Sequence, residues 1–350
     1  MKILYFTKYT RKGASSRLRS YQYFPYLEAQ GIEITVSPLF SDQYLENLYA
    51  HKSTIKWTLK AYIQRFFALT KVLKYDKIVI EKELFPYLPA CGEFLLKLFR
   101  IKYIVDYDDA IFHNYDQNPN PVIRFFLKRK IDKVMKYSYT VIVGNDYLAK
   151  RAKEAKARNI QIIPTVIDVG RYHVKKHEVR EQVVIGWIGS QSTFKYLLLL
   201  KDVLQQLIKE YNILVHIVGT KESLGLGENE IHIEWSEETE VSSILNFDIG
   251  IMPLRDTLWE QGKCAYKLIQ YMGCGLPVVA SPVGMNNDVV RDGYSGFLAN
   301  SDTSLFEYLK KYITNPELRA EHGKHGRLTV EEKYCINITA PKISQIIQSR

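Results

Sequence analysis

Two lysines four residues apart, Lys263 and Lys267, stand at the start of the segment 262–284, which reads GKCAYKLIQYMGCGLPVVASPVG. Apolar residues recur at helical spacing in its first half, and the Gly-Cys-Gly-Leu-Pro that follows ends a helix just before an apolar strand. The spacing predicts that both lysines lie on one face of a helix near its N-terminus. A cation there is unfavourable unless an anion is bound, because helix N-termini attract anions. We therefore expect a phosphorylated ligand in an α/β protein, although two solvated lysines would show the same spacing.

Three carboxylates, those of Asp106, Asp108 and Asp109, end the apolar run 102–109. Carboxylates this close repel one another, so a fold tolerates them best where they face a cation, hydrogen-bond donors or substrate hydroxyls. Asp108 and Asp109 are therefore candidate catalytic residues. The alternative is a solvated acidic turn that caps the next helix.

Small residues follow the first apolar run of each half of the chain. Gly189 and Ser190 stand between such a run and a helical segment, where backbone N–H groups can bind phosphate or a serine can simply cap the helix. In the first half the small residues are followed by a basic side chain, in the order Gly13, Ala14, Ser15, Ser16 and Arg17. That loop is either a plain helix cap or a ligand loop from which the arginine reaches an acceptor phosphate.

Short apolar runs separated by helical segments repeat along the whole chain. They predict strands at 2–9, 32–39, 76–82, 102–109, 139–145, 159–165, 183–190, 212–219, 231–236, 248–254, 277–281 and 296–300. Strands that alternate with helices indicate parallel, doubly wound sheets, whose ligands bind at the carboxyl ends of the strands. The polar stretch 167–182 interrupts the pattern. We therefore expect two domains, residues 1–170 and 171–338, followed by a helix within 339–350.

Basic residues are concentrated in the first domain of this 350-residue chain, whose net charge is +10. Residues 1–170 contain 28 Lys and Arg against 16 acids, whereas the remaining residues contain 20 against 22. Residues 51–75 contain six Lys and Arg and no acid, and residues 123–136 contain six and one acid. Such stretches suit an anionic membrane surface or a lipid phosphate, but ordinary amphipathic helices with solvated lysines have the same composition.

Cysteine usage and hydropathy predict the location of the protein. Four cysteines without metal-like spacing are typical of reduced thiols in the cytoplasm. No apolar run reaches the roughly 18 residues of a membrane span, and the first residues read as a strand instead of a signal peptide. We expect a cytoplasmic protein that is peripheral on the inner membrane face.

A series of short motifs runs through both halves in a specific order. They are DYDDAIF, VIVGNDYLA and IIPTVID in the first domain, and IGWIGS, DIGIMPL, KLIQYMGCGLPVVASPVG and DGYSGFLA in the second. In this order and spacing they resemble the retaining GT-B glycosyltransferases of family four, the group-1 glycosyl transferases. The resemblance implies two Rossmann-like domains facing across a cleft, with the C-terminal helix packed back on the first domain. It also implies transfer of a sugar from a nucleoside diphosphate donor with retention of configuration.

On the donor side, the resemblance implies a role for five positions. Lys263 and Lys267 would stabilise the leaving diphosphate, and Gly189 and Ser190 would lie beside its phosphates. The two acidic residues that the family usually carries eight apart fall on Gly262 and Gln270 in this sequence. Gln270 would therefore bind the donor ribose through a neutral amide.

On the acceptor side, the resemblance places Asp108 beside the transferred sugar, with Asp109 close by. The loop that contains Gly13, Ala14, Ser15 and Arg17 would lie across the cleft near donor and acceptor. The tripeptide DYD also matches the metal-binding D-x-D motif of the other glycosyltransferase fold. Two Rossmann-like halves argue against that fold, so we expect no metal.

The sequence thus predicts a metal-independent, hexosyl-type glycosyltransferase that needs no cofactor beyond its nucleotide sugar. Its acceptor would be a lipid-linked or saccharide intermediate of polysaccharide or glycolipid synthesis, and nucleic acid is not an expected partner. Two alternatives stay open. One is a non-catalytic nucleic-acid-binding protein that uses the basic half, since aromatics among Lys and Arg suit base stacking. The other is a homologue that binds the donor but does not turn it over.

Overall fold

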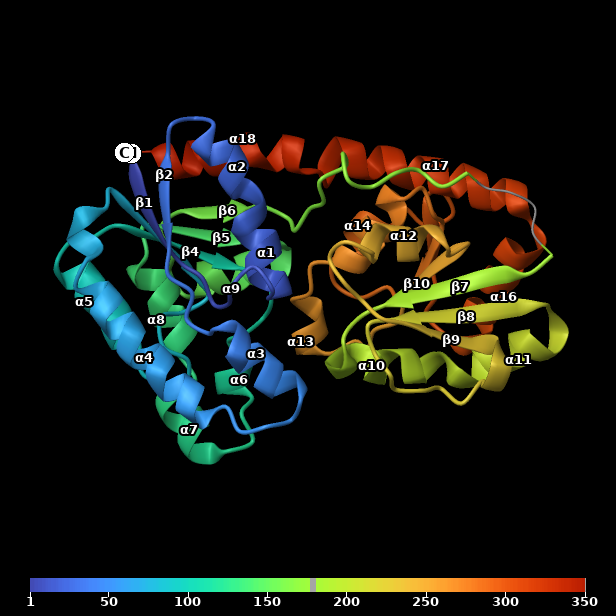
Figure 1. Cartoon of the computed structure of the whole chain (residues 1–350), viewed down its shortest axis with the longest axis horizontal. Helices are drawn as coiled ribbons and strands as arrows, with labels where there is room; N and C mark the ends of the chain where they lie inside the picture. Colours follow the sequence, from blue (N-terminus) through green and yellow to red (C-terminus); the bar gives the residue numbers. More distant parts are fainter. Residues whose placement is uncertain (177–180, 350) are drawn as a thin grey trace. The chain divides into compact units, whose positions relative to one another are not determined.

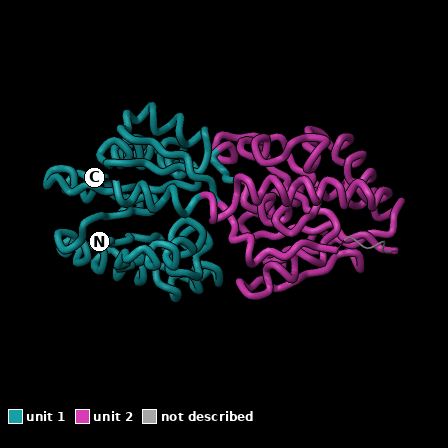
Figure 2. Tube along the Cα trace, turned by 90° about the horizontal axis from the view of Figure 1, so that it is seen from above, with its two compact units in different colours: residues 1–165, 262–264, 339–350 teal, residues 166–261, 265–338 magenta. Residues whose placement is uncertain are grey.

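The computed structural model describes residues 1–176 and 181–349, which form two compact units (Figure 2). Unit 1 comprises residues 1–165, 262–264 and the chain from Thr339 onward, and unit 2 comprises residues 166–261 and 265–338. Each unit contains its own six-stranded sheet (Figure 1). Of the polar stretch 167–182, residues 177–180 lie outside the described residues, and the rest counts with unit 2.

The sheet of unit 1 has the strand order β2-β1-β3-β4-β5-β6, and all neighbouring strands are parallel. The strands are β1 (Lys2–Phe6), β2 (Glu33–Val36), β3 (Lys77–Glu81), β4 (Tyr103–Tyr107), β5 (Thr140–Val143) and β6 (Ile160–Ile162). The helices are α1 (Ala14–Arg19), α2 (Phe24–Glu28), α3 (Asp42–Tyr49), α4 (Ile55–Leu69), α5 (Cys91–Leu98), α6 (His113–Asp116), α7 (Pro121–Leu127), α8 (Lys130–Tyr137) and α9 (Asp146–Glu154). Helices α4, α5, α7, α8 and α9 share one hydrophobic cluster with the side chains of β1, β3, β4 and β5.

The sheet of unit 2 has the order β12-β11-β10-β7-β8-β9 and is also parallel. Its strands are β7 (Val183–Ile188), β8 (Ile213–Val218), β9 (Glu230–Ile233), β10 (Ile249–Met252), β11 (Val278–Ala280) and β12 (Gly296–Leu298). Its helices are α10 (Gln191–Leu197), α11 (Lys201–Glu210), α12 (Glu240–Leu245), α13 (Leu258–Gln261), α14 (Tyr266–Gly273), α15 (Asn286–Val289), α16 (Asp302–Thr314) and α17 (Pro316–Lys333).

The last helix, α18 (Ile336–Gln348), contains the predicted C-terminal helix, and its residues from Thr339 onward count with unit 1. The hydroxyls of Thr339 and Tyr23 lie 2.9 Å apart, and the Gln348 amide donates to Gln30 at 3.1 Å. These contacts hold the helix against the residues that flank α2 on both sides.

Each predicted strand coincides with a strand of the structure, so the expected α/β architecture of two Rossmann-like sheets is confirmed. The apolar runs are readable because strands of a parallel sheet are covered on both faces and have few exposed positions. Within the described residues, none of the helices combines the length and the apolar character needed to cross a bilayer.

Candidate functional site

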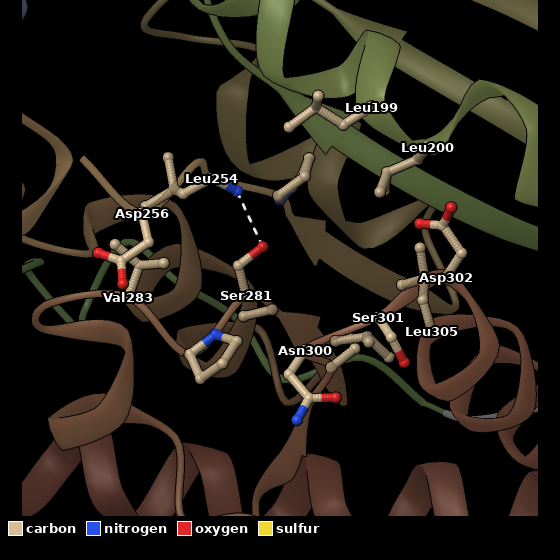
Figure 3. A pocket seen from close by; sticks show the side chains of 15 residues that line it. Leu199, Leu200, Leu254, Asp256, Ser281, Val283, Asn300, Ser301, Asp302 and Leu305 are labelled. Atoms are coloured by element: carbon tan, nitrogen blue, oxygen red, sulfur yellow. Dashed lines mark hydrogen bonds between the residues drawn. The ribbon is translucent and has the colours of Figure 1, made fainter.

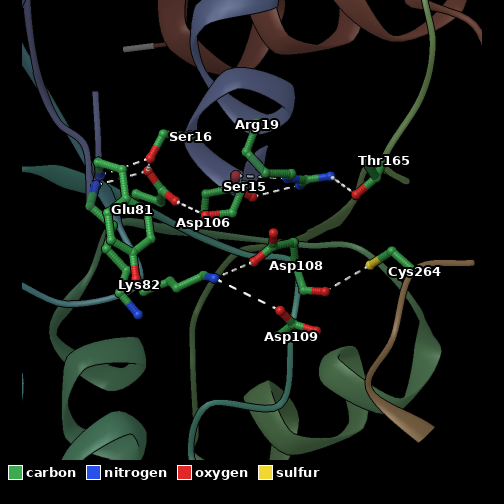
Figure 4. A network of polar contacts seen from close by, with 12 residues as sticks. Ser15, Ser16, Arg19, Glu81, Lys82, Asp106, Asp108, Asp109, Thr165 and Cys264 are labelled. Carbon is green, nitrogen blue, oxygen red and sulfur yellow. Dashed lines mark hydrogen bonds and ion pairs between the residues drawn. The ribbon is translucent and has the colours of Figure 1, made fainter. Parts of the chain in front are cut away.

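In unit 1 the acidic cluster lies at the carboxyl end of β4 and faces cations of the same unit (Figure 4). Asp106 accepts two hydrogen bonds from the Arg19 guanidinium, at 2.9 Å from Nε and 2.6 Å from Nη2. Arg19 also donates to the Ile163 carbonyl at 2.8 Å. This buried, bidentate ion pair joins α1, β4 and the segment after β6, so Asp106 has a structural role at the edge where the candidate residues lie.

Lys82 lies beside the other two carboxylates of the cluster. Its ammonium is 2.8 Å from Asp108 Oδ1 and 3.9 Å from Asp109 Oδ2. It follows β3 directly and has a left-handed backbone, with φ 66°. The sequence gives no signal for this residue, because only the pairing of β3 with β4 brings residue 82 to residue 108.

The pKa values of the two carboxylates are shifted in opposite directions. Burial alone would raise the pKa of Asp108, but the Lys82 ammonium outweighs burial and holds that pKa below its ordinary value. Burial and the Asp108 charge together raise the pKa of Asp109 above its ordinary value, while Lys263 and Lys82 oppose the rise. Asp108 is thus the more acidic member of the pair.

The small-residue loop after β1 is shorter than predicted. Only Gly13 precedes the helix, because α1 already begins at Ala14, and Ser15 and Arg17 are helical residues as well. Ser15 donates to Glu81 at 2.7 Å, and Arg17 is buried. The first turn of α1 therefore packs against the end of β3.

Gly13 is required at its position by close packing. A Cβ there would lie 2.4 Å from the Cβ of Tyr9. The proposed contacts of this loop with an acceptor remain a prediction.

The expectation that Lys263 and Lys267 share a helical face is wrong. Ala265 has a left-handed backbone, with φ 50° and ψ 26°, so α14 begins only at Tyr266. Lys263 precedes the helix and counts with unit 1, where its carbonyl accepts from the Asn145 amide at 3.0 Å. The neighbouring Cys264 thiol donates to the Asp108 carbonyl at 3.0 Å, which places this segment beside the acidic cluster.

Lys267 lies in the first turn of α14, at the carboxyl edge of the unit 2 sheet. Its ammonium is 4.0 Å from the ring centroid of Trp187, the penultimate residue of β7. Gly189 makes room for this contact, since a Cβ there would lie 2.4 Å from Lys267 Nζ. The predicted phosphate-binding lysine and the predicted phosphate-binding turn are thus brought together. Ser190 precedes α10 and its hydroxyl lies 2.9 Å from that of Ser192.

Gln270 is buried in α14, where its amide belongs to a chain of polar side chains. Its Nε2 donates to the Tyr172 hydroxyl at 2.9 Å, and that hydroxyl donates to Glu240 at 2.7 Å. The Trp235 indole donates to the second Glu240 oxygen at 2.9 Å. A carboxylate thus lies two hydrogen bonds from the position where the resemblance expects one, on a different element. Sequence spacing gives no signal for a group that joins residues so far apart in the chain.

A cavity of about 540 Å³ lies at the carboxyl ends of β10, β11 and β12 (Figure 3). Its wall includes Leu199, Leu200, Ser281 and Asn300, and the Ser281 hydroxyl accepts from the Leu254 N–H at 3.0 Å. None of the predicted donor-binding residues lines it. Asp256 and Asp302 also belong to the wall, and their carboxylates make it a poor site for a diphosphate.

Two further observations concern residues outside these groups. Glu260, one turn of chain before Lys263, is buried and accepts hydrogen bonds from the Tyr196 and Thr257 hydroxyls. In residues 1–176 and 181–349, His, Cys, Asp and Glu side chains do not gather into a group of three or more that could hold a metal ion.

The chain was compared with protein families and curated proteins. Residues 182–315 match the model of the family described as glycosyl transferases group 1. Two uncharacterized glycosyltransferases of Methanocaldococcus jannaschii are 39% identical over 61 residues and 33% identical over 78 residues. These alignments cover 17% and 22% of this chain and only 17% and 20% of the relatives.

Solved structures resemble the chain over its whole length. Sucrose-phosphate synthase from Thermosynechococcus elongatus has a TM-score of 0.72 at 14% identity, covering 99% of this chain and 98% of the other. Anabaena Alr3699/HepE, in complex with UDP and glucose, has a TM-score of 0.74 at 16% identity, with full coverage of both chains. At such identities the likeness concerns the fold. Residues 182–315 thus match the glycosyl transferases group 1 domain, within a chain that has the GT-B fold.

Proposed function

We propose that this protein transfers a sugar from a nucleoside diphosphate donor to an acceptor hydroxyl with retention of configuration. The observation that carries the proposal is the Lys267 ammonium beside Gly189 at the carboxyl end of β7, inside the segment that matches the glycosyl transferase family. Ligands of doubly wound sheets bind at this edge. A nucleic-acid-binding function is not favoured, because the comparisons give glycosyltransferases.

In the proposed reaction the bond between the anomeric carbon and the diphosphate oxygen breaks, and the acceptor oxygen bonds to that carbon. The acceptor proton passes to the departing phosphate. Negative charge develops on the leaving diphosphate, and Lys267 is positioned to stabilise it. We assign the donor ribose to Gln270 and the hydroxyls of the sugar to Asp108, the carboxylate that Lys82 keeps ionised.

The donor is proposed to be a UDP-hexose, since solved neighbours were determined with UDP and glucose and with UDP-glucose. The acceptor is proposed to be a saccharide or a lipid-linked intermediate. A saccharide-related ligand is present in one further neighbour, Staphylococcus aureus TarM with fondaparinux, α-GlcNAc-glycerol and UDP, at 18% identity and a TM-score of 0.60. No metal and no further cofactor is assigned to the reaction.

A thermal-shift panel of UDP-, GDP-, ADP- and CDP-sugars tests donor binding. A ligand at a hundred times its Kd stabilises the folded state by about 2.7 kcal/mol, which raises the Tm by several degrees. Lys267→Met should abolish most of the shift, while Lys324→Met, at an exposed lysine of α17, should leave it unchanged. The absence of a shift with every nucleotide sugar would contradict the proposal. Donor binding without release of nucleoside diphosphate in the presence of acceptors would support an inactive homologue instead.

A further inference from the structure

Helix α4 lies on the outside of unit 1 (Figure 1). It exposes the apolar side chains that an amphipathic helix normally buries. Its fully buried residues are Ala61 and Arg65, and the Arg65 guanidinium donates to the Thr7 carbonyl at 2.8 Å. Large apolar residues point to solvent instead, and at successive turns they are Ile55, Leu59, Ile63, Phe66 and Phe67. The first is 70% exposed and the others are about as open. A soluble surface seldom carries so long an apolar stripe without a partner.

Two more helices of the same unit show the same inversion. In α7, Phe125 and Phe126 are each 72% exposed, and their rings pack edge to face on one another with centroids 5.1 Å apart. At the end of α5, Leu98 and Phe99 are 61% and 69% exposed. The exposed side chains of residues 51–75, 91–100 and 121–129 are called the basic apolar face below.

The three helices cover the same side of the unit 1 sheet. Leu69 of α4, Leu96 of α5 and Leu127 of α7 all belong to the hydrophobic cluster on β1, β3, β4 and β5. Helices α4 and α5 also meet directly, since a Cβ on Gly92 would lie 3.7 Å from Leu69 Cδ1. The exposed apolar side chains therefore belong to one layer of helices and not to scattered parts of the unit.

The charge of the basic apolar face is of one sign. Exposed lysines and arginines follow the apolar residues in all three segments, and they are Lys52, Lys56, Lys60, Lys71, Lys74, Lys97, Arg100, Arg124, Lys128 and Arg129. In residues 51–75, 91–100 and 121–129 the sole acidic residue is Glu93. Its side chain is buried and accepts a hydrogen bond from the Leu84 N–H at 2.9 Å. A partner must therefore offer negative charge together with an apolar interior.

We infer that the basic apolar face docks the protein on an anionic lipid bilayer. Phenylalanine, leucine and isoleucine side chains enter the boundary between headgroups and acyl chains, while the lysines and arginines lie among the headgroups. Nucleic acid would satisfy the charge, but aliphatic side chains such as Ile55, Leu59 and Ile63 gain nothing from base stacking. Docking on the bilayer would bring the proposed transferase to an acceptor at the lipid surface. This location of the acceptor rests on the proposed function, whereas the docking itself does not.

Sedimentation with vesicles tests the binding without any nucleotide sugar. The full chain should bind vesicles of phosphatidylcholine with about 30% phosphatidylglycerol. It should bind at least tenfold less to pure phosphatidylcholine, and at least tenfold less in 0.5 M salt, where screening shortens the range of the attraction. Equal binding to both vesicle types would overturn the inference.

Substitutions at exposed positions test which surface binds, because they leave the core intact. Binding to the anionic vesicles should fall at least tenfold in a variant that combines Phe66→Ser, Phe67→Ser, Phe125→Ser and Phe126→Ser. It should not fall in a variant that combines Leu198→Ser with Leu328→Ser in unit 2. The same binding should fall by up to about a hundredfold in a variant that combines Lys52→Gln, Lys56→Gln and Lys60→Gln, since each basic residue near the membrane surface raises the binding constant about fivefold. The matched control is Lys209→Gln, Lys221→Gln and Lys324→Gln.

Indole fluorescence locates the contact on α4. Trp57 lies in this helix, with the ammonium groups of Lys56 and Lys60 at 5.9 Å and 5.7 Å from its ring centroid. Brominated lipids should quench the emission of the bound protein, and Trp57→Phe should remove most of the quenching. Quenching that persists in Trp57→Phe would refute docking on lipid. So would a protein that does not bind vesicles but forms a concentration-dependent dimer, if the fourfold Phe→Ser variant abolishes that dimer. Donor binding in the thermal-shift panel should be unchanged in the fourfold Phe→Ser variant. The proposed docking on lipid and the proposed donor binding can therefore be refuted independently.

Discussion

The substitution Gly189→Ala tests how unit 2 holds Lys267. The new Cβ would lie 2.4 Å from Lys267 Nζ and 2.5 Å from the Trp187 ring, both well inside contact distance. The indole is buried in the core, whereas a lysine can swing its ammonium away. We expect the methyl group to displace Lys267, and the remaining overlap with the indole to lower the free energy of unfolding by about 1–3 kcal/mol, as overpacking usually does.

Displacement of the ammonium should also weaken donor binding. A hydrogen bond to a charged group contributes about 1.5–3 kcal/mol, so the Kd of the donor should rise roughly 10- to 150-fold. Denaturant unfolding gives the stability change, and titration calorimetry with the nucleotide sugar gives the affinity. Gly170→Ala, at an exposed glycine of the same unit, is the control and should change neither quantity appreciably.

A double-mutant cycle isolates the cause. In a Lys267→Ala background, Gly189→Ala should weaken donor binding no further, because the ammonium that it displaces is already absent. If Gly189→Ala raised the Kd equally in both backgrounds, the turn would act independently of Lys267. An unchanged free energy of unfolding would show that the close packing described for Gly189 is not real.

Four further predictions concern the other groups. Asp108→Asn should reduce sugar transfer far more than donor affinity, and a fully active variant would remove Asp108 from the reaction. Lys82→Met should lower the free energy of unfolding by about 3–5 kcal/mol, because it leaves the largely buried Asp108 carboxylate without its cation; a stability near that of the wild type would contradict this pairing. Burial lowers the pKa of His322 below its ordinary value of 6.5, so the folded state favours the neutral imidazole. The stability from this preference is complete above pH 6.5 and is lost as the pH falls. Between pH 7.5 and 5.5 the Tm should therefore drop less in His322→Asn than in the wild type. A chelator such as EDTA should leave transfer unchanged, and activity that Mg²⁺ or Mn²⁺ restores would overturn the metal-free assignment.

The strands and their division between two parallel sheets could be predicted because their signal is local. Each buried parallel strand is a short apolar run, and each helix between strands has its own periodicity. At Lys263 the helical spacing predicts a helix that begins too early. Apolar spacing continues through Cys264 and Ala265, but the left-handed backbone of Ala265 delays the helix, and periodicity carries no information on a single dihedral angle.

Partners of the candidate residues were beyond the reach of sequence reasoning. Arg19 and Lys82 meet the acidic cluster only because β3 pairs with β4 and α1 packs on the same edge. Likewise, Glu240 approaches Gln270 only through Tyr172, which comes from the polar stretch where the sequence suggested a mere boundary. Three carboxylates in a row indicated that counter-charges must exist, but not which residues supply them.

Unit 1 is assembled from three separate stretches of chain, one of them only three residues long. Exchanging a whole unit between this protein and a relative would therefore need several recombination junctions, and one of the exchanged pieces would be the short segment that carries Lys263 and Cys264. A stop codon after residue 338 would likewise delete Thr339 and the rest of the helix that contacts Tyr23 and Gln30. A chimera with a single crossover after residue 165 would therefore pack a unit 1 sheet from one parent against a short segment and a last helix from the other.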